Sequence, residues 1–226
     1  MSGVRAAGLD GYRHGWFAVV LHAGRFQRAD AYMTVADALT GLADCDRIGV
    51  DAPIGLVEHG AREADTAARG VLGASASSVF LTPSRWVLSA DDYGEANRRG
   101  RESGRGVSRQ AWALRARILE LEALQPLPAC VLEVHPEVAF RDLAGRRLPS
   151  KRSWTGVRRR LALLSDADIH LPIDVPDGVR ARADDVLDAA VVAWVAAAPE
   201  DGLVSYPSSP EQEAHGRPIA IWSRRP

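Results

Sequence analysis

Three acidic residues end or interrupt short apolar runs, where a carboxylate is costly to bury. Asp10 follows Ala6–Leu9, Asp51 follows Ile48–Val50, and Glu133 lies within Val131–Val134. A buried carboxylate needs an opposite charge, hydrogen bonds or a bound cation. Each acid taken alone is also explained as a turn former or a helix cap, most plainly Asp10 before Gly11. Three of them in one chain favour a shared site.

A further acidic group lies in the segment 184–190, which is predicted to be helical. Asp185 and Asp188 are three residues apart, and Asp184 and Asp188 are four apart, so their side chains share one face. Acids in a first helical turn are ordinary because they interact favourably with the helix dipole. Asp188 lies one turn further in, where that explanation fails. Like charges at this spacing repel, so we expect a cation beside them.

The elements that must position these acids follow from the apolar pattern. Strands are expected at 4–9, 16–21, 25–33, 48–50, 129–134 and 218–222, and helices after Thr34, across 60–125, from Pro136, at 153–164 and at 182–198. This order predicts an α/β fold with an RNase H-like mixed sheet, in which three antiparallel strands precede the parallel ones and helices flank the sheet. We expect a single domain over residues 1–226, with a helical insertion at about 60–125.

Longer segments support this fold. In chain order they are Val50–Leu56, Ser78–Arg85, Ser108–Gln110, Glu133–Glu137, Lys151–Arg160 and Asp184–Ala189. Together they resemble domain-of-unknown-function family 429, whose members are described as predicted nucleases of the RNase H-like, resolvase-like superfamily. The resemblance runs in order over nearly the whole chain, although the activity of that family is itself an inference.

The resemblance to the resolvases implies a metal site. In their pattern the strand and helix carboxylates bind two divalent ions, and the corresponding residues here are Asp10, Asp51, Asp185 and Asp188. Asp51 stands where those resolvases carry Glu, so its shorter side chain requires a closer backbone. The expected cofactor is Mg²⁺ or Mn²⁺, since two such ions activate water and stabilise the leaving oxygen of a phosphodiester. The implied activity is a metal-dependent nuclease with DNA or RNA as its partner.

Other candidate site residues are less specific. Glu133 and His135 have no clear resolvase counterpart. Strand alternation puts both on one face, which we expect to look toward the metals, with His135 as a proton donor or, equally well, as the residue that holds the Pro136 turn. Arg85, Lys151 and Arg160 are candidate substrate-binding residues that would grip a phosphate. Each has the alternative of pairing with a local acid.

Several side chains receive ordinary structural interpretations. Asp65 and Arg69 are four residues apart on one predicted helix, which favours a surface ion pair. Core packing is the favoured interpretation of Trp86, Trp112 and Trp154, and stacking on bases is the alternative.

Composition limits the class of protein. The chain has 226 residues, 46% hydrophobic and 25% charged, which is typical of a globular protein and excludes a disordered or membrane-spanning chain. Two cysteines are too few for a disulfide framework or a structural zinc site, and no signal segment is evident, so we expect a cytoplasmic protein. The net charge of −1 gives no large attraction for nucleic acid, although arginines are concentrated at 98–109 and 146–160.

Three alternatives to a nuclease stay open. A non-catalytic binding module could retain the fold, and its sign would be missing carboxylates. A phosphotransferase like the sugar kinases and actin-like ATPases usually has a duplicated core and paired glycine-rich phosphate loops, which this chain lacks. A small-molecule phosphoesterase could use the same acids.

Overall fold

The first three strands form an antiparallel meander. The computed structural model describes residues 3–176, 179–213 and 216–225, and it opens with β1 (Arg5–Tyr12), β2 (Gly15–His22) and β3 (Arg25–Tyr32). The turn between β2 and β3 has φ values of 52° at Ala23 and 80° at Gly24. Two positive φ values in a two-residue turn match the right-handed twist of the strands. β1 extends to Tyr12, so Asp10 lies inside this strand, opposite Phe17 of β2, and not in a turn after it.

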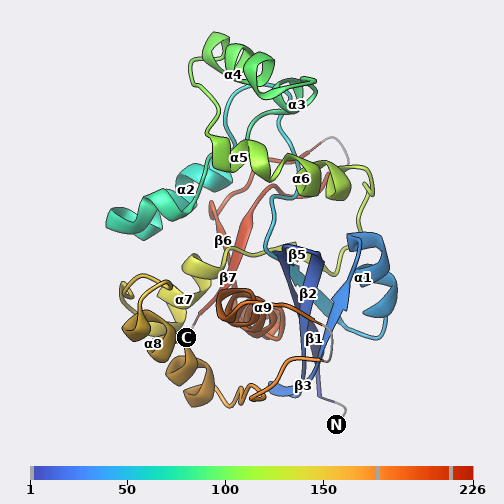
Figure 1. Ribbon diagram of the computed structural model, residues 1–226, viewed down its shortest axis with the longest axis vertical. Helices are drawn as coiled ribbons and strands as arrows, with labels where there is room; N and C mark the ends of the chain where they lie inside the picture. Colours follow the sequence, from blue (N-terminus) through green and yellow to red (C-terminus); the bar gives the residue numbers. More distant parts are fainter. Residues whose placement is uncertain (1–2, 177–178, 214–215, 226) are drawn as a thin grey trace. The chain divides into compact units, whose positions relative to one another are not determined.

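Two parallel strands complete the sheet. β4 (Arg47–Val50) pairs with β1, and β5 (Val131–Glu133) pairs with β4, which gives the order β3-β2-β1-β4-β5 (Figure 1). Helix α1 (Val35–Gly41) begins after Thr34, whose hydroxyl accepts a hydrogen bond from the Asp37 amide, and it contacts β2 and β3. Three antiparallel strands followed by parallel ones form the predicted RNase H-like mixed sheet.

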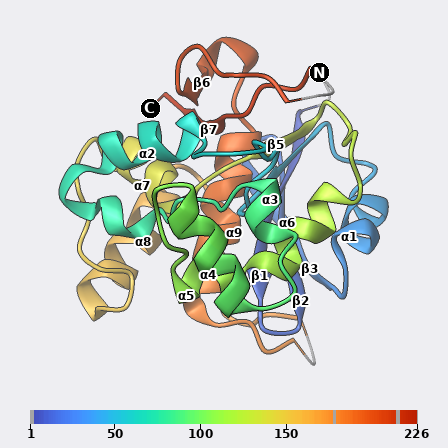
Figure 2. The same cartoon turned by 90° about the horizontal axis from the view of Figure 1, so that it is seen from above.

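One face of this sheet is covered by α9 (Ala183–Ala196), which packs on β1, β2 and β4. α7 (Pro136–Ala144) and α8 (Trp154–Asp166) lie on the other side of α9 from the sheet (Figure 2). The carboxyl end of α9 is fixed by Arg47, which donates to the carbonyl oxygens of Ala196 and Ala198 at 3.1 and 2.6 Å. A cation at this end also favours the helix dipole.

Glycine lets α9 approach the sheet closely. A Cβ atom at Gly8 would lie 2.1 Å from the Ala189 carbonyl oxygen and 2.2 Å from the Ala193 amide nitrogen. A Cβ atom at Gly49 would lie 2.6 Å from a methyl group of Val192. The backbone of β1 thus lies directly against the backbone of the helix that carries Asp188.

Gly8→Ala is expected to destabilise the protein, because both atoms that it would meet belong to the backbone of a buried helix. Overpacking of this kind costs about 1–3 kcal/mol. The matched control is Gly70→Ala in helix α2 (Glu63–Leu72), where an added Cβ meets nothing within 4 Å. That change should stabilise by about 0.5–1 kcal/mol through helix propensity. Urea unfolding of both variants checks this, and equal effects would contradict the close approach of α9.

The chain divides into two compact units. The sheet unit comprises residues up to 52, 128–204 and 222 onward, and the helical unit comprises 53–127 and 205–221. The helical unit contains α2, η1 (Gly73–Ser78), α3 (Arg85–Leu88), α4 (Tyr93–Glu102), α5 (Arg109–Ala113) and α6 (Arg115–Glu122). After Ser108 the chain forms two helices, α5 and α6, that meet at Leu114. The helices expected at 60–125 thus fall in the helical unit, and the single-domain description of 1–226 stays a prediction.

The C-terminal region differs from the expected pattern. A 3₁₀ turn, η2 (Glu200–Gly202), leads into β6 (Leu203–Tyr206), which forms a separate two-stranded sheet with β7 (Ile221–Arg224). β6 was not predicted, and the last strand begins later than expected. Among the described residues, no helix combines the length and apolar character needed to cross a membrane.

Candidate functional site

Backbone pairing brings Asp10 and Asp51 together. The parallel pairing of β1 with β4 ends at Leu9 and Val50, and the Asp51 amide donates to the Leu9 carbonyl oxygen at 2.8 Å. Asp10 and Asp51 are the next residues on these two adjacent chains. Gly8 faces α9, so strand alternation turns Asp10 toward α9 as well. The backbone thus places these two acids side by side at the carboxyl ends of the paired parts of β1 and β4.

The α9 acids lie close enough to act on Asp10. Burial raises the pKa of Asp10 well above its usual value, and the neighbouring charges of Asp51, Asp188 and Asp185 raise it further. These are the four residues expected to form the acidic group. Loss of solvation on burial is the main physical cause of the shift, and repulsion by the neighbouring carboxylates adds to it.

Asp188 is the most deeply placed acid of α9, with 2% of its surface exposed. The Lys151 ammonium donates a hydrogen bond to its Oδ2 atom. Oδ1 is buried and has no hydrogen-bond partner within the described part of the chain. Burial raises the pKa of Asp188 to about 6, although Lys151 acts to lower it.

Lys151 is the cation expected beside the acids. Burial acts to lower its pKa, but the charges of Asp188, Asp51 and Asp10 outweigh that effect and raise the pKa above the usual value. The ammonium therefore stays charged at neutral pH and compensates part of the acidic group. The substrate-binding role expected for Lys151 stays a prediction, and its resting partner in the structure is Asp188.

The loop that carries Lys151 is held by a buried arginine. Arg160 is 1% exposed, and its Nη2 donates to both carboxylate oxygens of Glu137 at 2.8 Å. Its Nη1 donates to the carbonyl oxygens of Pro149 and Gly156 at 2.9 and 3.1 Å. A Cβ atom at Gly156 would lie 1.9 Å from the Ser150 carbonyl oxygen. Arg160, for which we expected substrate contact, thus has both terminal nitrogens bonded to Glu137 and to the loop.

Asp185 caps the helix. Its Oδ2 accepts a hydrogen bond from the Arg182 amide at 2.7 Å, at the start of α9. Burial raises its pKa, and this hydrogen bond opposes the rise. The capping role explains why an acid stands at this position, and the metal-ligand role stays a prediction.

The register of β5 turns Glu133 away from Asp10. Gly49 pairs with Leu132 and faces α9, so Val50 and its partner Glu133 face the opposite side of the sheet. Val134 packs with the α9 residues in one core cluster, which agrees with this alternation. The expectation that the Glu133 side chain looks toward the aspartates is therefore wrong for β5 as it is paired. His135 follows the strand and immediately precedes α7, where its proton-transfer role stays a prediction.

Arg85 lies in the helical unit and pairs with acids of that unit. Its guanidinium contacts Glu122 and lies 3.3 Å from a Glu58 carboxylate oxygen. This is the local pairing that the sequence left open as the alternative to phosphate binding. Two arginines of the 98–109 stretch are also paired, Arg98 with Glu102 at 3.3 Å and Arg99 with Glu95.

Two simple structural expectations are wrong. Asp65 is buried, and its Oδ2 accepts the Thr82 amide at 2.6 Å, while Arg69 donates to carbonyl oxygens instead of pairing with it. Trp154 is 76% exposed, with the Arg158 guanidinium 5.6 Å from its ring centroid. Trp86 and Trp112 pack against the helical unit's core, as expected.

The acids fit a divalent cation in donor type. Carboxylate oxygens are the ligands that Mg²⁺ and Mn²⁺ prefer, and the Asp188 Oδ1 atom is a buried oxygen without a partner in the part of the chain that the structure describes. As the side chains stand, no three His, Cys, Asp or Glu residues of the described ranges form a ready-made metal-binding group. Lys151 holds the other oxygen of Asp188, so metal binding requires that ammonium to give up or share this carboxylate.

The raised carboxyl pKa values predict how stability depends on pH. Between the usual value of 3.8 and about 6, folded Asp188 keeps a proton that the unfolded chain releases. The free energy of unfolding should therefore fall as pH rises through this window, by about 3 kcal/mol from Asp188 alone. Asp10 acts in the same direction.

Urea unfolding with a chelator, at about pH 5 and about pH 7.5, covers the upper unit of this window, where about 1.4 kcal/mol of the loss from Asp188 should appear. The loss of stability should be smaller in Asp188→Asn than in the wild type. A wild-type protein that gains stability relative to this variant as pH rises would contradict the prediction.

The structure defines an α/β protein with an RNase H-like mixed sheet, in which Asp10 and Asp51 lie at the carboxyl ends of β1 and β4. The chain belongs to the family described as "Protein of unknown function (DUF429)", whose model matches residues 8–212. This family is the one that the sequence segments resemble. No curated protein and no solved structure matches the chain.

Proposed function

We propose that the sheet unit is a metal-dependent hydrolase that cleaves phosphodiester bonds of nucleic acid. The observation that carries this proposal is the group formed by the buried Asp10 and Asp188 with the partly buried Asp51, in which one oxygen of Asp188 has no partner among the described residues. Burying carboxylates that repel one another lowers the stability of a protein, and such groups are commonly functional sites, here one suited to binding a cation. The proposed location is the cytoplasm, in keeping with two cysteines, Cys45 and Cys130, that form no disulfide bond.

Each residue has a defined role in this proposal. Asp10, Asp51 and Asp188 hold Mg²⁺ or Mn²⁺, with Asp185 beside them. The bound ions supply an activated water and stabilise the leaving oxygen. Lys151 moves from Asp188 to the substrate, where its ammonium pairs with the negative charge of the phosphate. Arg160 and Glu137 act as positioning residues because they hold the loop of Lys151.

A second candidate is a binding module that retains the fold without catalysis. It is favoured by the ion pair between Lys151 and Asp188, which already neutralises part of the acidic group. The lack of a ready-made metal group in the described residues points the same way. In this case the acids would bind no divalent cation at all.

Calorimetric titration with Mn²⁺ separates the two candidates. The wild-type chain should bind Mn²⁺ and, in its presence, cleave labelled single-stranded DNA, single-stranded RNA or a four-way junction. Metal binding without cleavage of these substrates, but with hydrolysis of bis(p-nitrophenyl) phosphate, would identify a small-molecule phosphoesterase. No metal binding and no cleavage would favour the binding module.

A further inference from the structure

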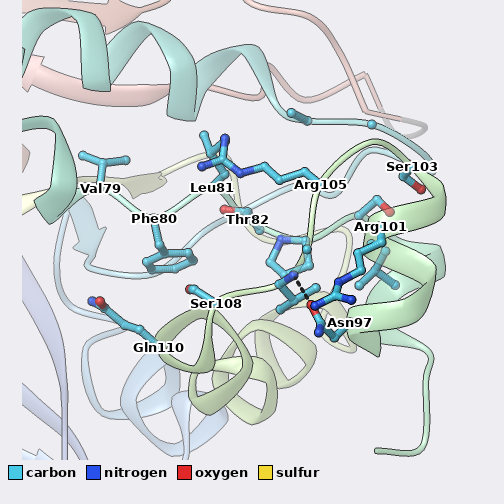
Figure 3. A pocket seen from close by; sticks show the side chains of 18 of the residues that line it. Val79, Phe80, Leu81, Thr82, Asn97, Arg101, Ser103, Arg105, Ser108 and Gln110 are labelled. Carbon is cyan, nitrogen blue, oxygen red and sulfur yellow. Dashed lines mark hydrogen bonds between the residues drawn. The ribbon is translucent and has the colours of Figure 1, made fainter. Parts of the chain in front are cut away.

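The helical unit contains a cavity of about 740 Å³, made by a different set of residues from the acidic group. Its walls are the extended segment 79–84, helix α4 and the segment 105–110, which leads into the first residues of α5 (Figure 3). Two of the segments singled out in the sequence, 78–85 and 108–110, therefore meet around one space. Its volume lies within the usual range for small-molecule sites.

The charge of the cavity is positive and uncompensated. Arg69, Arg101 and Arg105 line it, and none of the lining residues that the structure describes is acidic. The side chains of Arg101 and Arg105 form no hydrogen bond or ion pair with other described residues, whereas the Arg69 side chain donates to two backbone carbonyl oxygens. In Figure 3, Arg105 extends along the cavity and Arg101 enters from α4.

The acids nearest in sequence cannot supply the missing charge. Glu95 and Glu102 of α4 are already paired with Arg99 and Arg98. The Asp92 side chain accepts the Glu95 amide as the cap of α4. Two arginines directed at the same space without a carboxylate favour an anionic ligand with several oxygens, such as a phosphate.

The remaining walls favour a ligand with a polar and an apolar part. Ser84 is 2% exposed, and its hydroxyl oxygen is buried without a hydrogen-bond partner in the described residues. Such a group is normally satisfied by a ligand or by water. Phe80, Leu81 and Val87 supply an apolar surface on which a planar ring can pack.

We infer that this cavity binds a nucleoside monophosphate. The phosphate lies between Arg101 and Arg105, the base packs against Phe80, and Ser84 bonds to a polar atom of the ligand. This site is independent of the proposed hydrolase activity, because it needs neither a divalent cation nor the acidic group.

The probe is AMP, titrated into the full chain in the presence of a chelator, with binding measured by calorimetry. AMP should bind more tightly than adenosine or inorganic phosphate alone, since each carries only one part of the recognised chemistry. Arg105→Gln should weaken AMP binding by about 10- to 100-fold. Arg98→Gln removes the same charge from α4 outside the cavity and should change affinity by about twofold or less. Thermal melting of both variants verifies that they fold.

Ser84→Ala gives a second test that leaves the charge unchanged, and it too should weaken AMP binding. Failure of AMP to bind the wild type at millimolar concentration would overturn the inference. Equal losses in Arg105→Gln and Arg98→Gln would also overturn it, because they would mean attraction by net charge alone. Binding of single-stranded DNA without binding of AMP would overturn the choice of a mononucleotide.

Discussion

Asp10→Asn is expected to abolish divalent-metal-dependent cleavage by the sheet unit, with a fall in rate of about 10³-fold or more. The residue is buried beside Asp51 and Asp188, and its charge is one of those that a cation would neutralise. In the absence of metal the same change should leave stability unchanged or slightly higher, because it removes a charge from a mutually repelling group. Cleavage assays and calorimetric Mn²⁺ titration measure the first effect, and urea unfolding measures the second.

The matched control for Asp10→Asn is Asp46→Asn. Asp46 lies at the opposite ends of the same two strands, where its carboxylate accepts a hydrogen bond from the Arg5 amide. This variant loses the same formal charge and should cleave at the wild-type rate. If Asp10→Asn instead unfolds the metal-free protein while Asp46→Asn does not, Asp10 is a structural residue and the proposed metal site is wrong.

Arg160→Met is expected to cause the largest loss of stability, about 3 kcal/mol or more. The substitution leaves the Glu137 carboxylate without its buried partner and removes the bonds to Pro149 and Gly156. For a chain of this length the midpoint of thermal unfolding should fall by on the order of 10 °C. The substitution also frees the loop that carries Lys151, so the proposed hydrolysis of phosphodiester substrates should slow as well.

Arg159→Met is the control, since Arg159 is the exposed neighbour on the same helix. It should change stability by no more than about 0.5 kcal/mol. A double-mutant cycle with Glu137→Met isolates the pair, because the second substitution should cost little once the first is present. Independent, additive losses would contradict the pairing.

The sheet and two of its acids were predictable because local patterns determine them. Apolar runs that end at Asp10 and Asp51 give both the strands and the acids, and short turns between the first three strands give their antiparallel order. The position of Asp188 followed from helical spacing. In each case the information lies within one element or its immediate neighbours.

The partners of the site residues were not predictable in the same way. Lys151 meets Asp188 across 37 positions of sequence, and nothing local to either residue specifies that contact. The direction of Glu133 depends on strand register, and a shift of one residue turns every side chain to the other face. Arg160 looks like a surface arginine in the sequence, yet it is buried, with its two terminal nitrogens bonded to Glu137 and to two carbonyl oxygens.

The helix that covers the sheet is also the last large element of the sheet unit to be synthesised. All five strands of the sheet precede α9 in the chain, so Phe17, Val19 and Leu21 wait for residues 183–196 to bury them. During translation the finished strands therefore present an apolar surface that only a late segment can cover. Nascent chains that stall before α9 should therefore be held by chaperones or degraded.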